Sequence, residues 1–285
     1  MAAVSITFLV PLLILLAVLL TLTVRALRGS VSRKRVEEFA KLHSLTVTAA
    51  NGDQIIAYRA TTRRWRTAGL LLGVVVQILV GGHFTIEFWW VLAGWFAGAI
   101  VAELRVAQLA RAPRAAASLT ARQSADYLPA IGRWAVPATV AACLAVAVFG
   151  AARSGTGRTV DAGLLELWTG LGVAVGAATF AAQRYVLRRP QPRVEPDRLA
   201  ADDAIRSRSM HVLAGAGMTL VLYCVLGQLA ASKVLDGPQT GPIAVFLLFG
   251  NPILGRMLAY WPWSPDRGRQ DAGRDVGRDA GRASA

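Results

Sequence analysis

The chain has 285 residues, of which 54% are hydrophobic, and its formal net charge is +14. Its mean hydropathy of +0.45 is too high for an ordinary soluble domain of this length, and it excludes a disordered chain. The two cysteines, Cys143 and Cys224, lie inside apolar runs, so a secreted disulfide scaffold is excluded as well. The composition predicts a multi-pass membrane protein, and the preference for Arg over Lys indicates a bacterial origin.

Seven apolar runs nearly free of charge predict an all-α, polytopic transmembrane helix bundle over residues 1–264. Each run approaches the roughly 20 residues that a helix needs to cross a bilayer. Buried core helices would explain one such run, but not seven that are separated by basic loops. The runs are continuous rather than alternating, which argues against a β-barrel. The predicted spans are 4–24, 68–84, 87–104, 134–152, 163–183, 210–231 and 242–260.

The first span is predicted to be an uncleaved anchor, because its apolar part is too long for a signal peptide and basic residues follow it. In the loop 25–66 that comes next, residues 36–43 have helical spacing. Asn51-Gly52 is a turn signal between two short segments, which predicts a β-hairpin after that helix. Two strands alone are marginal in water. Residues 31–66 are therefore interpreted as a small basic collar or as a docking surface for a protein partner.

Two later segments are polar. A helix is predicted to start within 184–208 and to run into the sixth span. There Asp202 and Arg206 are spaced for an ion pair on one helix face, with a cation site at Asp202 and Asp203 as the alternative. Residues 265–285 carry three Asp-x-Gly-Arg tetrads and no apolar face, which predicts a disordered cytoplasmic tail.

Loop charge predicts the orientation. If the N-terminus lies outside, the inner segments hold 28 of the 31 Lys and Arg residues; these segments are 25–66, 103–133, 184–208 and the tail from residue 256. This bias predicts an N-out, C-in protein of the plasma membrane. Its basic inner face would meet anionic lipid headgroups, so nucleic acid is not needed to explain the charge.

Two candidate sites lie within or near the spans. Gly250, Asn251 and Pro252 interrupt the last span near its middle, because Pro252 has no N–H for the carbonyl of Leu248. Such breaks form substrate sites in transporters, and they also occur as ordinary kinks. The other candidate is an outer mouth that attracts a cation, although carboxylates there also reach interfacial water. It comprises His83, Glu87 and Glu166.

Two further patterns concern contacts between helices. Glu103 and Arg256 each lie about one turn inside the predicted inner interface, which suggests an ion pair. The third and fifth spans share a spacing of one Trp and two Gly residues, which favours close helix packing and raises the question of an internal repeat. The matching positions are Trp90, Gly94 and Gly98, and Trp168, Gly172 and Gly176.

The sequence contains none of the common short catalytic, metal or nucleotide-binding motifs, and no cofactor is predicted. The leading interpretation is a non-catalytic plasma-membrane protein that acts through binding or as part of a membrane assembly. One alternative is a small-molecule transporter or permease subunit that uses the break in the last span. Another is an intramembrane enzyme whose active site combines single residues from separate helices.

Overall fold

The computed structural model describes most of the chain, and all structural statements below concern this part. The described residues are 17, 21, 23–24, 31–81, 88–109, 115–116, 123–155, 160–189, 191–192, 196–236 and 240–261. The predicted first span, 4–24, lies almost entirely outside them, and the predicted tail, 265–285, lies wholly outside.

The described residues form an all-α structure apart from one two-residue pairing. The helices are α2 (Arg33–Leu42), α3 (Gly52–Gly81), α4 (Phe88–Leu109), α5 (Ala130–Gly155), α6 (Ala162–Arg188), α7 (Pro196–Ala231), α8 (Gly241–Val245) and α9 (Asn251–Ala259). A 3-10 turn, η1 (Ser124–Asp126), precedes α5, and a π-helical turn, η2 (Phe246–Gly250), joins α8 to α9. The strands β1 (Ala115–Ala116) and β2 (Gln191–Pro192) pair antiparallel.

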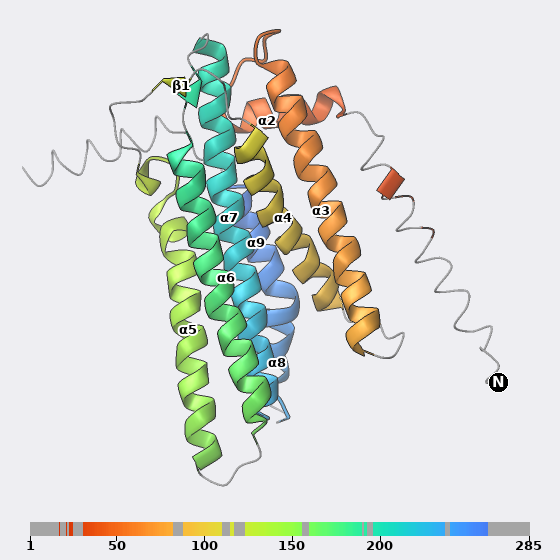
Figure 1. Cartoon of the computed structure of the whole chain (residues 1–285), viewed down its shortest axis with the longest axis vertical. Coiled ribbons are helices and arrows are strands. Elements are labelled where there is room, and N and C mark those ends of the chain that lie inside the picture. Colours follow the sequence, from red (N-terminus) through yellow and green to blue (C-terminus); the bar gives the residue numbers. More distant parts are fainter. Residues whose placement is uncertain are drawn as a thin grey trace, which may run out of the picture.

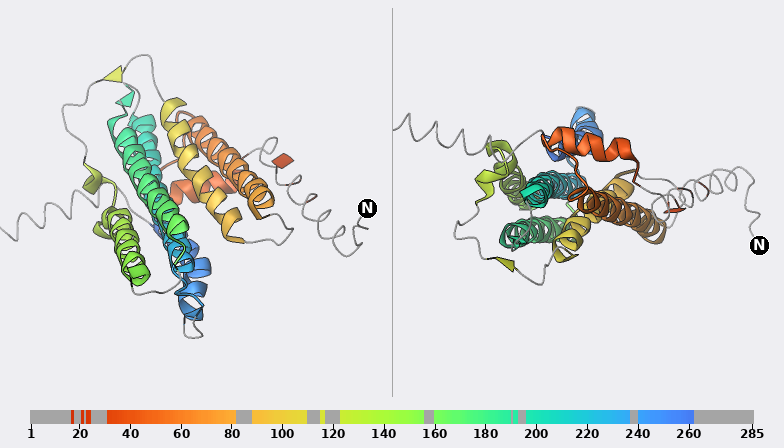
Figure 2. Two further views of the ribbon diagram at one scale, coloured as in Figure 1. Left: turned by 60° about the horizontal axis from the view of Figure 1, so that its bottom comes forward. Right: turned by 90° about the horizontal axis from the view of Figure 1, so that it is seen from above.

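The long helices run side by side around α7, which contacts α3, α4, α5, α6 and α9 (Figure 1). In the most apolar part of α7, 67% of the residues are buried, against 22% for α5 and for α6. The short helix α2 lies across one end of the bundle, where the other helices are seen end-on (Figure 2). We call this the α2 end. The C-terminal ends of α3, α5 and α7 lie at the opposite end.

Five helical segments are long and apolar enough to cross a membrane: Trp89–Gln108, Ala130–Gly155, Ala162–Arg188, Pro196–Ala231 and Gly241–Ala259. Their outward faces are apolar rather than polar. Val148 of α5 exposes 71% of its surface, Leu167 of α6 60% and Ile253 of α9 60%. Such an exposed apolar belt is stable in lipid and unfavourable in water. The chain is therefore an integral membrane protein.

The helix α3 differs from these five because only its second half is apolar. Arg63, Arg64 and Arg66 lie in its first half, and the uncharged part runs from Thr67 to the end of the helix. That half exposes Leu72 and Leu79, by 60% and 77%. The surface of this half is thus apolar, like the outward faces of the five segments above.

The predicted β-hairpin around Asn51-Gly52 is wrong, because α3 begins at Gly52. The Asn51 side chain closes a local turn instead, accepting from the Thr48 N–H at 2.9 Å and donating to the Thr46 carbonyl at 2.9 Å. Ile55, Tyr58 and Thr62 are all buried, and their three- and four-residue spacing is that of a helix face. The predicted helix at 36–43 is confirmed, since α2 covers most of it.

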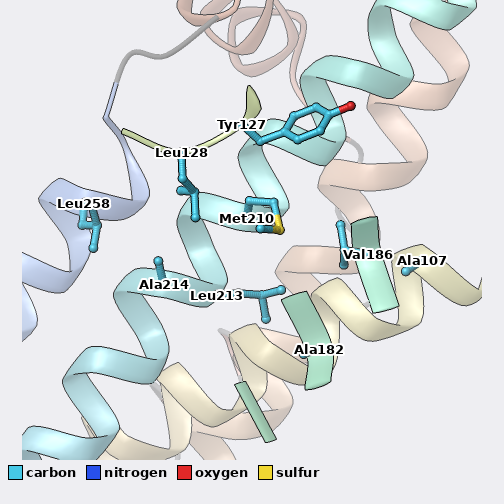
Figure 3. Close-up of a cluster of buried hydrophobic side chains, with 9 residues drawn as sticks. All are labelled: Ala107, Tyr127, Leu128, Ala182, Val186, Met210, Leu213, Ala214 and Leu258. Carbon is cyan, nitrogen blue, oxygen red and sulfur yellow. The ribbon is translucent and has the colours of Figure 1, made fainter. Parts of the chain in front are cut away.

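The α2 end has a hydrophobic core of its own. Val36 and Phe39 of α2 pack with Ile55 and Tyr58 of α3, and the cluster is completed by Val106, Ala201, Ala204 and Ile205. A second cluster joins α4, α6, α7 and α9 just below; Figure 3 shows its members Ala107, Tyr127, Leu128, Ala182, Val186, Met210, Leu213, Ala214 and Leu258. The predicted helix that leads into the sixth span is confirmed by α7, whose first turns belong to the first cluster.

Glycines bring α3 and α4 into backbone contact. A Cβ atom on Gly94 would lie 2.3 Å from the carbonyl oxygen of Gly69, and a Cβ atom on Gly69 would lie 2.3 Å from that of Gly94. In lipid, close backbone approach of this kind supplies much of the packing attraction between helices. The echoing residues Gly172 and Gly176 also face the preceding helix, but there they meet the side chains of Cys143 and Val140. The α3–α4 and α5–α6 pairs thus have glycines at matching positions of their second helix. In the first pair these glycines meet backbone, and in the second they meet side chains.

Candidate functional site: two hollows beside a broken helix

The last helix is irregular where the sequence predicts a break. The π-helical turn η2 ends at Gly250, and Pro252 lies in the first turn of α9. The Leu248 carbonyl receives the hydroxyl of Tyr223 from α7, at a long 3.5 Å. The carbonyl that Pro252 leaves without a helical donor thus has its contact from the neighbouring helix α7.

Asn251 instead ties the break to α7. It is fully buried, and its Nδ2 donates to the Thr219 carbonyl at 3.0 Å. One turn on, α9 touches α7 so closely that a Cβ on Gly215 would lie 2.2 Å from the Gly255 carbonyl oxygen. Of the three residues predicted for a site at the break, Asn251 therefore holds two helices together. Of the same three, Pro252 alone lines either of the two hollows described below.

One hollow, which we call the aromatic pocket, lies at the end opposite α2 and has a volume of about 640 Å³. Its walls come from α4, α6, α7, α8 and η2, and they include Trp89, Trp168, Tyr223 and Phe249. The Trp89 ring is tilted against Trp168 and Tyr223, with centroids 5.7 and 6.5 Å away. Such aromatic walls suit the burial of an apolar molecule.

Polar groups at the aromatic pocket are few. Asp161 caps α6 by accepting from the Leu164 N–H at 3.0 Å, and Lys233 adds the one cationic side chain among the lining residues. Beside the pocket, Gln228 donates to the Thr169 hydroxyl at 2.7 Å, which links α7 to α6. The pocket is thus apolar in its walls and charged at its edge.

The second hollow, which we call the arginine groove, has a volume of about 510 Å³ and lies between α3, α4, α7 and α9. Arg66, Arg256 and Tyr260 line its end nearest α2, and the remaining lining residues are apolar. Phe249 lines both the arginine groove and the aromatic pocket. The two hollows therefore meet at the irregular turn of the last helix.

A buried carboxylate lies beside the arginine groove. Glu103 of α4 has no exposed surface; its Oε1 accepts from the Tyr58 hydroxyl at 3.2 Å, and its Oε2 accepts from the Ser209 hydroxyl at 2.7 Å. Its cationic neighbour is Arg66, whose Nη2 lies 3.8 Å from Oε1.

The structure thus places Arg66 where sequence reasoning expected Arg256. The cue was present in the sequence, since Arg66 precedes the apolar run of α3 and Glu103 follows that of α4. In a pair of antiparallel helices, these two positions lie at the same depth in the membrane. Arg256 instead lies over the ring of Tyr260, 5.4 Å from its centroid. Arg208 also lies over the Tyr260 ring, 3.8 Å from its centroid, and it donates to the carbonyl of Ala259.

The predicted pair of Asp202 and Arg206 is present, with Nη2 and Oδ2 3.0 Å apart, and it is buried rather than exposed to water. Asp202 is also bridged by Arg189, so both of its oxygens are used. Arg206 donates from Nη1 to the carbonyls of Val186, Leu187 and Arg189 at 2.7 to 3.1 Å. The residues lock the end of α6 onto α7 and do not form a cation site.

Two residues of the predicted outer mouth, His83 and Glu87, lie outside the described residues, and the third, Glu166 of α6, is exposed. Within the described ranges, no three His, Cys, Asp or Glu side chains come together in a way that could hold a metal ion. Comparison with family models, curated proteins and solved structures gave no match to this chain.

His43 at the α2 end predicts a pH dependence of stability. Burial, together with the charges of Arg208 and His211, lowers the pKa of His43 from 6.5 to about 3, so the folded protein keeps it neutral. Below pH 6.5 the unfolded chain takes up the proton, so stability is lost as the pH falls. At pH 5 the loss from this residue is about 2 kcal/mol.

His43→Phe keeps the ring contact with Phe39 and should lessen the drop in melting temperature between pH 7 and pH 5. An equal drop in both proteins would contradict this assignment.

Proposed function

We propose that the protein is a seven-span plasma-membrane protein, N-out and C-in, with the α2 end in the cytoplasm. Two observations support this. The described helices gather the basic segments 31–66 and 184–189 and the start of α7 at the α2 end, and the outward faces between the two ends are apolar. An inner face rich in Arg and Lys is the usual arrangement for membrane proteins.

Cysteine labelling tests this orientation. Cys143 and Cys224 are buried, so they are replaced by alanine to give a silent background. Single cysteines at Gly157 and Gly237 should react with a membrane-impermeant maleimide in intact cells. A cysteine at Gly52 should react only after the cells are opened, and its Cβ would meet nothing closer than 3.9 Å. Labelling of the Gly52 position in intact cells would overturn the orientation.

We further propose that the protein acts by binding an apolar small molecule in the aromatic pocket. The observation that carries this is a hollow of about 640 Å³ whose walls are mainly aromatic and aliphatic side chains. That volume is in the range of small-molecule sites, which are roughly 300–1,000 Å³. The molecule would reach the pocket from the bilayer or from outside, because the pocket lies at the end opposite α2.

Photolabelling in lipid nanodiscs tests this binding. The probe is a trifluoromethyl-phenyl diazirine, and mass spectrometry maps the labelled residues. Saturable labelling of Trp89, Trp168 and Tyr223 is expected. Ala230→Trp fills the pocket from an exposed position and should remove this labelling. Ala174→Trp is the matched control on the exposed face of α6. Unsaturable labelling, or labelling unchanged by Ala230→Trp, would contradict the proposal.

A transporter is the second candidate, because Phe249 lines both hollows at the irregular turn. π-Helical turns are frequent at functional sites, and interrupted helices form the binding sites of many transporters. The two functions differ in one observable. A transporter would move the bound molecule across the membrane of a proteoliposome, whereas a binding protein would only retain it.

A further inference from the structure

We propose that the arginine groove is a binding site for one anionic phospholipid of the leaflet at the α2 end. Its phosphate would lie against Arg66 and Arg256, and an acyl chain would lie along α4 and α9. This site shares Phe249 with the aromatic pocket but has its own arginine-lined end, and its test does not depend on the ligand proposed for the pocket.

The polar end of the groove has an excess of positive charge. Arg66, Arg208 and Arg256 bring three guanidinium groups to this region against the single carboxylate of Glu103. Glu103 already accepts two hydroxyl donors, and its contact with Arg66 is long at 3.8 Å. The Nε of Arg66 is buried without a hydrogen-bond partner. Within the described part of the chain, Arg256 forms no ion pair, so it is available to a phosphate.

The rest of the groove is apolar and faces the bilayer. Leu92, Trp95 and Phe96 of α4 form one wall, and Phe249 and Ile253 near α9 form the other. Phe249 and Ile253 expose 54% and 60% of their surface. From Phe249 to Arg256 is seven residues, or about 10 Å of helix. A groove that is cationic at the interface and apolar toward the membrane centre matches a lipid with an anionic head and a hydrocarbon tail.

A soluble anion would fit this groove less well. It would contact the two arginines but none of the apolar walls. Most of the lining would therefore contribute nothing to its binding free energy. A zwitterionic lipid would fill the walls but would bring its own positive charge to the arginines. Anionic phospholipid satisfies both ends of the groove.

Native mass spectrometry of the purified full-length chain tests the site. The probes are phosphatidylglycerol and phosphatidylcholine with identical acyl chains, titrated into detergent micelles. Phosphatidylglycerol should bind with the higher affinity. Arg256→Gln and Arg66→Gln should each lower that affinity about fivefold, with little effect on phosphatidylcholine. Arg256 is exposed, so its variant is expected to fold.

Arg64→Gln is the matched control. It removes one exposed charge from α3, the helix that carries Arg66, without altering the groove lining. Its affinity for phosphatidylglycerol should equal that of the unaltered protein. An equal loss in Arg64→Gln would show diffuse surface attraction instead of a site, and an unchanged preference in Arg256→Gln would overturn the proposal. Complete displacement of phosphatidylglycerol by inorganic phosphate would assign the groove to a soluble anion and would likewise overturn it.

Discussion

Gly94→Ala is expected to destabilise the protein by on the order of 1–3 kcal/mol, although it adds a single methyl group. The new Cβ would lie 2.3 Å from the carbonyl oxygen of Gly69, and backbone cannot swing aside as a side chain can. Relief requires α3 and α4 to move apart, which loses the packing attraction along the hairpin. The melting temperature of the purified protein in detergent measures the effect.

The matched control is Gly170→Ala on α6, where a Cβ would meet nothing within 4 Å. Alanine is about 1 kcal/mol more favourable than glycine inside a helix. This variant should therefore be as stable as the unaltered protein or more stable, so the two identical substitutions have opposite expected signs. A melting temperature for Gly94→Ala at or above that of Gly170→Ala would show that the helices do not approach as described.

Arg206→Ala is expected to cost about 3–5 kcal/mol, the usual effect of removing one partner from a buried ion pair. The change takes a donor from three carbonyls at the end of α6, and it leaves Asp202 buried with Arg189 alone. Loss of folded protein, or a large fall in its melting temperature, is the expected result. Arg206→Lys should recover only part of the stability, because a single ammonium cannot replace the planar fork.

Arg33 and Glu37 provide the comparison, because they form an ion pair with the same four-residue spacing. Their nitrogen and oxygen are 2.7 Å apart, but the side chains are 93% and 57% exposed. Water screens such a pair, so Arg33→Ala should change stability by less than about 0.5 kcal/mol. If both variants lost stability equally, burial would not be the cause of the large effect at Arg206.

The sequence was a good guide to features that repeat along a helix. Apolar runs predicted the positions of α4 to α9, and spacing predicted both α2 and the Asp202–Arg206 pair. The same logic failed at residues 54–58, where a turn signal was given more weight than the three- and four-residue spacing of Ile55, Tyr58 and Thr62. Ile55 and Tyr58 pack against α2 and the first turns of α7, and Thr62 is buried as well. Only a helix places all three on one buried face.

Contacts between helices were harder to predict, because several partners of the right chemistry are available at each depth of the bundle. Arg66 and Arg256 lie at similar distances from the predicted interface, so either could have paired with Glu103. The arrangement of the helices around α7 places Arg66 next to it. Likewise, the Leu248 carbonyl could have taken a donor from its own helix, yet Tyr223 of α7 supplies it.

The sequence by itself determined that this chain is helical and lies in a membrane. It also predicted which loops carry the positive charge, since all of these follow from the composition of continuous segments. Only the tertiary structure decided which faces of those segments meet. It brought Trp89, Trp168 and Tyr223 around one hollow and Arg66 and Arg256 to the other. The reason is physical: segment composition sets the free energy of insertion into lipid, whereas close packing between particular glycines, hydroxyls and arginines sets the arrangement of helices within it.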